Sequence, residues 1–182
     1  MPTIVSSYIP TLAGAVDTRV RDSLPWTLAA RPQAMSVYVR FQESGTIQIA
    51  GRIVQVGALA ADTVPRLMIQ STGAFYRALV ETASVQRTST LASAPAIGQM
   101  VELLLTLSAA GVVQISQSIA RGAISTATAS AATILPPAWA GTTLTFNSSG
   151  VASDDGAVAL THLYIMRGVQ DFATMRQSAG TL

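Results

Sequence analysis

The hydrophobic positions of this chain recur mainly at every second residue. Between Met35 and Phe41 the odd positions are apolar, while the even positions can face solvent or a second layer, which is the pattern of a half-buried strand. Further short runs of this kind cover residues 46–50, 53–56, 66–70, 74–80, 100–107, 112–119, 142–146 and 160–166. Turn-forming residues separate the runs at 43–45, 71–73, 109–111, 148–150 and 154–156. Many short strands with regular turns predict an all-β fold, either a single antiparallel β-sandwich or a barrel.

A hairpin is predicted where residues 108–111 separate two of these runs. The connection ends in glycine, which adopts a left-handed backbone conformation without steric cost. The second strand of this hairpin, 112–119, has one apolar face and one face with hydroxyl and amide groups. We expect Gln114, Ser116 and Ser118 to face outwards.

One short helix is predicted near the end of the chain, over residues 170–177. Phe172 and Met175 are three positions apart and therefore share a face, and Asp171 lies in the first turn. Gly180 follows just beyond the helix. We expect one or two turns that cap an end of the sandwich.

The first 22 residues differ from the remainder. Pro2 and Pro10 disfavour regular helix, and the segment also holds small, flexible residues. We therefore expect an extended N-terminal arm over residues 1–22 and one sandwich domain over residues 23–182, with no linker that divides it.

Composition removes several classes of function. The chain has 182 residues, no Cys, 11 basic and 9 acidic side chains, and only 11% charged residues. The absence of Cys excludes thiolate metal sites and cysteine nucleophiles. Every basic residue is Arg, and the Arg residues are scattered along the chain, so we expect no nucleic-acid partner. Because the chain has no Lys, it cannot form a Walker-type phosphate loop. The uncharged stretch 103–120 contains too many polar groups for a membrane span, so we expect no membrane insertion.

The candidates for catalysis and metal binding are isolated. The lone His162 lies out of phase with Leu163, and a structural or solvent-facing role is favoured over that of a general base, which needs a matched partner. Glycosidases use paired carboxylates, whereas Glu43, Glu81 and Glu102 have no second acid two or four residues away. Residues 154–155 are both Asp and can cup Ca²⁺, but a solvated turn is the favoured interpretation. We predict no catalytic residue, cofactor or metal.

Aromatic residues make up only 5% of the chain. A stacking surface for sugars would therefore depend on few rings. The candidates for such a ligand rim are Trp26, Tyr76 and Trp139, although packing at the core or at strand ends is favoured for the two tryptophans.

Two motifs near the N-terminus carry a family resemblance. The sequence SYIPT at residues 7–11, followed by TRVRD at residues 18–22, resembles a signature of bacteriophage virion proteins. In those proteins the segment leads into a jelly-roll domain similar to concanavalin A and laminin-G domains, and it usually follows an upstream domain. Here the chain begins shortly before the motif, which favours a small accessory protein on a head or tail over a tail fibre.

The resemblance implies a place in a virion. Because the acids are isolated and there is a single His, we expect a non-enzymatic structural component, assembled in the host cytoplasm. We expect a surface-exposed, decoration-type protein that binds neighbouring virion subunits and forms a homo-oligomer. The resemblance also pairs Arg19 with Asp22 as a structural ion pair where the arm meets the sandwich. The arm is the candidate intersubunit element, by strand addition or apolar insertion. Its candidate contact residues are Ile4, Val5, Tyr8, Ile9 and Pro10.

Two other functions remain open from the sequence. The first is a carbohydrate-binding module that attaches to host-surface glycans through the concave sheet and the aromatic rim. The second is an enzyme, which the isolated acids and the single His disfavour.

Overall fold

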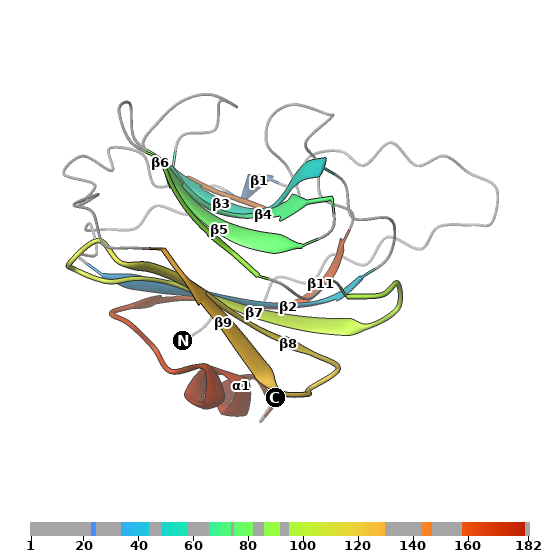
Figure 1. Ribbon diagram of the computed structural model, residues 1–182. Helices are drawn as coiled ribbons and strands as arrows, with labels where there is room; N and C mark the ends of the chain where they lie inside the picture. The colour runs from blue at the N-terminus through green and yellow to red at the C-terminus, as the bar shows by residue number, and fades with distance from the viewer. Residues whose placement is uncertain are drawn as a thin grey trace.

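The computed structural model contains two antiparallel sheets that face each other, with one helix below the second sheet (Figure 1). It describes residues 23–24, 34–43, 49–57, 66–73, 75–81, 86–91, 95–129, 143–146 and 158–180. The strands are β1 (Ser23–Leu24), β2 (Met35–Glu43), β3 (Ile49–Gly57), β4 (Arg66–Thr72), β5 (Tyr76–Glu81), β6 (Gln86–Thr90), β7 (Met100–Leu107), β8 (Val113–Ile119), β9 (Ile124–Thr128), β10 (Thr143–Phe146) and β11 (Val158–Arg167). The helix α1 spans Phe172–Gly180. The predicted all-β sandwich with a short C-terminal helix is confirmed, whereas the N-terminal arm lies outside the described residues.

The two sheets have different sizes and edges. The six-stranded sheet has the order β1-β10-β3-β4-β5-β6, and the five-stranded sheet has the order β11-β2-β7-β8-β9. The described strands at the sheet edges are therefore β1 and β6 in one layer and β11 and β9 in the other. All pairs in both sheets are antiparallel.

The main core fills the space between the sheets. Alternate residues of β2, β5, β7 and β8 point inwards and are buried, as the period of two in the sequence predicts. Phe41 and Tyr76 meet there edge to face, with ring centroids 5.5 Å apart and an angle of 79° between the planes. This arrangement is favoured between aromatic rings, so the pair stabilises the packing of the two layers.

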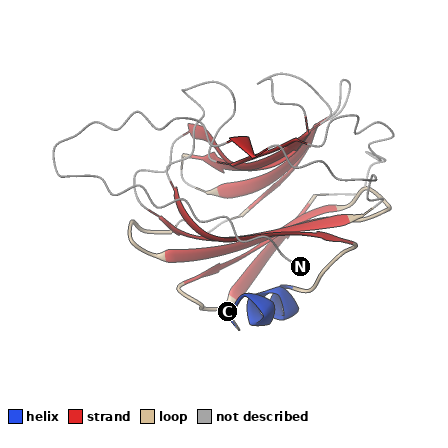
Figure 2. Ribbon diagram, turned by 180° about the vertical axis from the view of Figure 1, so that it is seen from behind, coloured by secondary structure: helices blue, strands red, loops and turns tan. Residues whose placement is uncertain are grey.

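The helix α1 covers the outer face of the five-stranded sheet, by which we mean the face turned away from the six-stranded sheet (Figure 2). The helix begins after Asp171, whose Oδ2 accepts a hydrogen bond of 2.9 Å from the backbone N–H of Thr174 and so caps the helix. Phe172 and Met175 pack onto Tyr38 of β2, in a cluster that also contains Leu104, Tyr164 and Ala179. The sequence predicted that the helix caps an end of the sandwich, and this prediction is wrong. The helix lies on the outer face because its apolar side chains and those of the sheet bury each other there.

Several local predictions can be compared with the structure. The hairpin between β7 and β8 is confirmed, and Gly111 has a φ of 79°, in the left-handed region. Residues 49–50 of the predicted run 46–50 and all of the run 53–56 belong to one strand, β3, whose pairing with β4 shifts register between Ile49 and Arg52 and again between Arg52 and Val54. The strands β6 and β9 were not predicted, because their sequences QRTST and ISTAT contain few apolar residues.

Candidate functional site

A row of polar side chains crosses the outer face of the five-stranded sheet. Cross-strand register places His162 of β11 opposite Arg40 of β2, Arg40 opposite Glu102 of β7, and Glu102 opposite Ser118 of β8. We call these four residues the polar row. Each alternates along its strand with an inward residue, so the strand period that builds the core also brings the row together.

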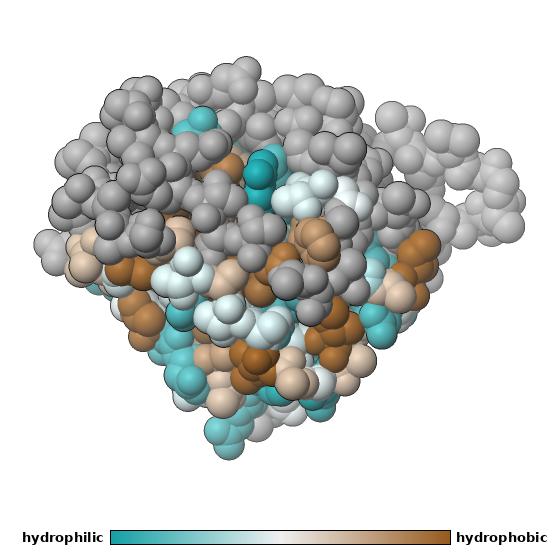
Figure 3. All heavy atoms as spheres, in the orientation of Figure 1, coloured by the Kyte–Doolittle hydropathy of each residue, from teal (hydrophilic) through white to brown (hydrophobic). Residues whose placement is uncertain are grey.

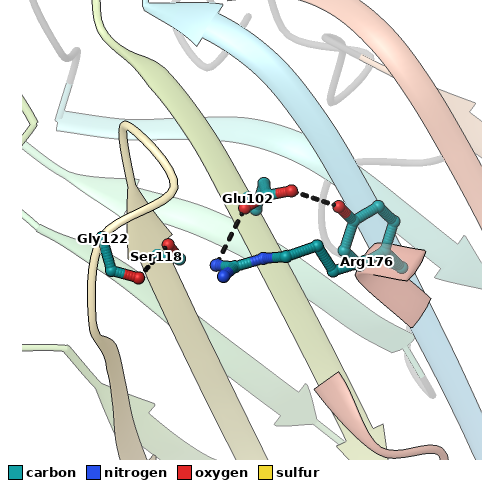
Figure 4. Close-up of polar contacts among 5 residues, drawn as sticks. Glu102, Ser118, Gly122 and Arg176 are labelled. Carbon is teal, nitrogen blue, oxygen red and sulfur yellow. Dashed lines mark hydrogen bonds and ion pairs between the residues drawn. The ribbon is translucent and has the colours of Figure 1, made fainter. Parts of the chain in front are cut away.

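Glu102 is the centre of this row and is only 1% exposed. Its Oε1 accepts a hydrogen bond of 2.8 Å from the hydroxyl of Tyr38, and its Oε2 forms an ion pair of 2.9 Å with Nη2 of Arg176 on α1 (Figure 4). The guanidinium carbon of Arg176 also lies 5.1 Å from the ring centre of Phe172. Both oxygens of the buried carboxylate are thus engaged by contacts within the chain, and these contacts connect the helix to the sheet.

The protonation states of the neighbouring groups fit this structural arrangement. Burial and the hydrogen bond to Glu102 raise the pKa of Tyr38 well above its ordinary value, so its hydroxyl stays neutral and donates. Burial and the nearby charge of Arg40 lower the pKa of His162, and the charge of Glu102 opposes this shift in part. Nδ1 of His162 is buried and has no hydrogen-bond partner. A general base needs an orienting acceptor, so the structural interpretation of His162 is favoured here too.

The lowered pKa of His162 predicts a pH dependence of stability. Its pKa in the folded chain lies below the ordinary 6.5, so the unfolded chain binds the proton more readily. The stability contributed by neutral His162 is therefore complete above pH ~6.5 and declines as the pH falls towards the folded pKa. We expect the unfolding free energy of the His162→Gln variant to fall less between pH 7.5 and pH 5 than that of the unchanged chain. Urea denaturation at the two pH values measures both. An equal loss in both proteins would show that His162 does not contribute.

A second buried polar contact lies between the sheets. The hydroxyl of Tyr76 on β5 donates a hydrogen bond to Oε2 of Glu43 at the end of β2, and both side chains are almost fully buried. Burial and the bond to Glu43 raise the pKa of Tyr76 far above its ordinary value. The proposed place of Tyr76 in a ligand rim is wrong, because an inward ring that is 1% exposed cannot stack on a sugar.

The Tyr76 hydroxyl is expected to stabilise the fold. We expect Tyr76→Phe to lower the unfolding free energy by about 1–3 kcal/mol, because Glu43 loses a buried hydrogen bond. Tyr164→Phe is the matched control, since the Tyr164 hydroxyl is buried without a hydrogen-bond partner, so its removal breaks no hydrogen bond and is expected to cause no loss of stability. Chemical denaturation of both variants measures the difference. Equal losses would contradict the role given to Glu43.

A polar ladder of side chains connects β8 to β9 and to the turn that precedes β9. Gln114 donates to the hydroxyl of Thr128 at 3.0 Å, and the hydroxyls of Ser116 and Thr126 lie 2.9 Å apart. The hydroxyl of Ser118 donates to the carbonyl of Gly122 at 2.9 Å (Figure 4). These side chains lie on the outward face, as predicted, but Ser116 and Ser118 are buried there. Most of β9 is exposed, so the ladder ends in an accessible strand.

The remaining predicted site residues fall outside the described residues. These are the arm residues Ile4, Val5, Tyr8, Ile9 and Pro10, the pair Arg19 and Asp22, the tryptophans Trp26 and Trp139, and the acidic turn at 154–155. Among the described residues, no three His, Asp or Glu side chains form a group that could hold a metal ion. The described helical residues offer no span with the length and hydrophobicity that a bilayer crossing needs.

Sequence reasoning missed the link between Glu102 and Arg176. A signal for it was present, because Glu102 lies within the apolar run MVELLLTL, where a charge needs a partner. The pattern did not indicate which cation supplies that partner. The exposed hydrophobic residues do not form one patch along the chain: Ile97 and Ile124 lie on separate segments, and Met166 and Val169 lie at and just after the end of β11. Hydrophobic and hydrophilic side chains are correspondingly mixed over the described part of the surface seen in Figure 3.

Comparison with solved structures identifies the fold. No protein-family model and no curated protein sequence matches the chain. Tailspike protein 2 of the Escherichia coli O157:H7 bacteriophage CAB120 aligns with 97% of this chain at 18% identity and a TM-score of 0.62, over 26% of the tailspike chain. The LG1-3 region of the laminin alpha2 chain aligns with 80% of this chain at 12% identity and a TM-score of 0.55, over 30% of that chain. The fold is a laminin-G-like jelly roll.

One further structure bears on catalysis. The enzymatically active domain of tailspike protein 2 from bacteriophage CBA120 aligns with 97% of this chain at 17% identity and a TM-score of 0.60, over 29% of that domain's chain. The chain thus spans less than a third of each of these proteins. A laminin-G-like jelly roll therefore occurs in enzymatic and other proteins, so the fold alone does not separate a catalytic from a non-catalytic role.

Proposed function

We propose that this chain is a non-catalytic structural domain of a bacteriophage particle, exposed on a head or tail, that binds neighbouring virion subunits. The observation that carries the proposal is the likeness to a phage tailspike over 97% of the chain. The sequence resemblance at residues 7–11 and 18–22 points to the same class of particle. Assembly in the host cytoplasm, an accessory or decoration role and a homo-oligomeric state belong to this proposal.

The described chemistry supports a role in contact rather than catalysis. Glu43 accepts a hydrogen bond from Tyr76 inside the sandwich, and Glu102 is bound to Tyr38 and Arg176 under the helix. These two carboxylates lie on opposite faces of the five-stranded sheet, so they do not form the pair that a glycosidase needs. His162 has a cation as its main charged neighbour and a buried nitrogen without an acceptor.

The arm over residues 1–22 and the sandwich over residues 23–182 are proposed as separate functional parts. The arm, with Arg19 and Asp22 at its junction, would attach the sandwich to a neighbouring subunit. We expect a chain without residues 1–15 to remain folded, because the described core lies within residues 35–179, but to lose its attachment to the particle. Circular dichroism and co-sedimentation with particles test this. Unchanged co-sedimentation would contradict the role of the arm.

The proposed function is tested on the particles themselves. Particles from cells that produce the phage are banded on a density gradient, and an antibody raised against the purified chain is used to probe each fraction. We expect the chain in the particle band, and labelling of intact particles in electron micrographs. A chain found only in the free protein fractions would overturn the proposal.

A carbohydrate-binding role is the second candidate, and the polar ladder is the observation that favours it. Thr126 and Thr128 are exposed and, together with the half-buried Gln114, offer hydroxyl and amide groups on one surface, which suits hydrogen bonding to sugars. Titration of the purified chain with host envelope glycans tests this role. Saturable binding that Gln114→Ala weakens would support it, and no binding at millimolar glycan would overturn it.

A further inference from the structure

Three of the four described edge strands have features that prevent pairing with another chain. Natural sheets protect their edges with short strands, charged residues or bulges, because an open edge is a template for a further strand. Strand β1 has only two residues, β6 contains Arg87, and β11 shifts register between Leu160 and His162 and ends in Arg167.

Strand β9 is the exception. Its five residues, Ile124–Thr128, contain no charge and no proline, and their pairing with β8 is regular from end to end. Four of these residues are exposed, and the side chain of Ile124 is 45% exposed. The sequence from residue 122 to residue 153 contains no charged residue at all. Among the described strands, β9 is thus the edge best suited to accept another strand.

The hydrogen bonds of the β8–β9 pair show which backbone groups face the open side. The N–H of Ala129 donates to the carbonyl of Val113 at 2.9 Å. Antiparallel strands alternate between residues that bond to the neighbour and residues that point away from it. In β9 the groups of Ser125 and Ala127 therefore face β8, and those of Ile124, Thr126 and Thr128 face outwards.

We infer that β9 pairs antiparallel with β9 of a second copy of this chain, about a two-fold axis at Thr126. In this register Thr126 faces the partner's Thr126, and Ile124 faces the partner's Thr128. Every outward N–H of these residues then meets an outward carbonyl, and the two five-stranded sheets become one continuous sheet. The inference rests on the proposed function and deepens it, because it names one of the neighbouring subunits as a second copy.

The strand is complementary to itself, which favours a second copy over an unrelated peptide. A two-fold interface places each residue near its own counterpart, so any charge in the middle of the strand would repel its copy. Strand β9 has none, and the residue on the axis is a threonine, a type that pairs well across strands. The nearest charged residue along the sequence, Arg121, precedes the strand and would be far from its counterpart in an antiparallel arrangement.

Sedimentation of the full chain over a range of concentrations tests the pairing. We expect a dimer, and we expect Thr126→Lys to weaken dimerisation by at least about tenfold, because two ammonium groups would face each other on the axis. Ala173→Lys is the matched control, since Ala173 is exposed on α1, and it should dimerise like the unchanged chain. Circular dichroism confirms that both variants fold. A monomer at every concentration, or a Thr126→Lys dimer of unchanged strength, would overturn the inference.

Cross-linking tests the register. Because the chain has no cysteine, Thr126→Cys introduces a single thiol. Directly bonded antiparallel pairs have Cα atoms about 5.5 Å apart, which lies within the range of about 4.4–6.8 Å that disulfides span. We expect mild oxidation to link Thr126→Cys into dimers but not Ala110→Cys, which places the thiol in the exposed turn between β7 and β8. Equal linking of the two variants, or none for Thr126→Cys, would overturn the register.

The experiments can overturn the two-fold pairing of β9 and the proposed function independently of each other. A chain that is monomeric in solution and does not cross-link through Thr126→Cys, yet bands with the particles, overturns the two-fold pairing and supports the proposed function. A chain that dimerises through β9 but is absent from the particles supports the pairing and overturns the proposed function.

Discussion

Arg176→Met is expected to lower the free energy of unfolding by about 3 kcal/mol at neutral pH, because it leaves a buried carboxylate without its counter-charge. Glu102 is 1% exposed, and Arg176 supplies the ion pair that compensates its burial. Methionine retains the long apolar stem, so the loss reports mainly on the charge. The remaining hydrogen bond from Tyr38 engages only one carboxylate oxygen. Chemical denaturation of the purified variant measures the effect.

Two further variants separate this charge effect from other causes. Arg167→Met removes an exposed arginine and is expected to change stability by no more than about 0.5 kcal/mol. The double variant Glu102→Gln with Arg176→Met should be more stable than Arg176→Met alone, because a neutral amide needs no counter-charge. If the double variant is the less stable of the two, the ion pair is not what stabilises the helix on the sheet.

Phe172→Ala is expected to lower the free energy of unfolding by about 3–5 kcal/mol. The Phe172 ring is buried at the start of α1, where it meets the Tyr38 ring edge to face at a centroid distance of 6.1 Å. Removal of this ring leaves a cavity between helix and sheet and also removes the surface under Arg176. Because the helix is short, we expect it to detach before the sandwich unfolds, which hydrogen exchange of residues 172–180 would detect as early loss of protection.

Val169→Ala is the matched control for this truncation. Val169 precedes the helix and is 55% exposed, so its truncation removes apolar atoms that are not buried. A change within about 0.5 kcal/mol is expected. A comparable loss in both variants would mean that Phe172 does not anchor the helix through burial.

The strand period was sufficient to predict the sandwich because the strands that build most of its core alternate strictly. In β2, β5 and β7 every second residue is apolar and buried, and those residues make the core. The same rule fails for β6 and β9, where threonine and serine take the place of apolar residues. Such strands are stabilised by backbone hydrogen bonds to the neighbouring strand and by hydroxyl contacts such as that of Ser116 with Thr126. A hydrophobic pattern does not predict these interactions.

The position of the helix and the polar row needed tertiary information. The spacing of Phe172 and Met175 predicts one apolar face, but it does not say which surface that face covers. The answer depends on Tyr38, Leu104 and Tyr164, which come from three strands and meet only once the sheet has formed. The burial of Ser116 and Ser118 has the same kind of origin, since strand period alone assigns a face and not its accessibility.

Electron cryomicroscopy of the intact particle tests most directly whether this chain acts by contact with neighbouring subunits. The proposed function predicts density for the two-sheet body on the outside of a head or tail, touching adjacent subunits. A particle map in which every density is assigned to other proteins, leaving this chain only in the free fraction, would contradict it.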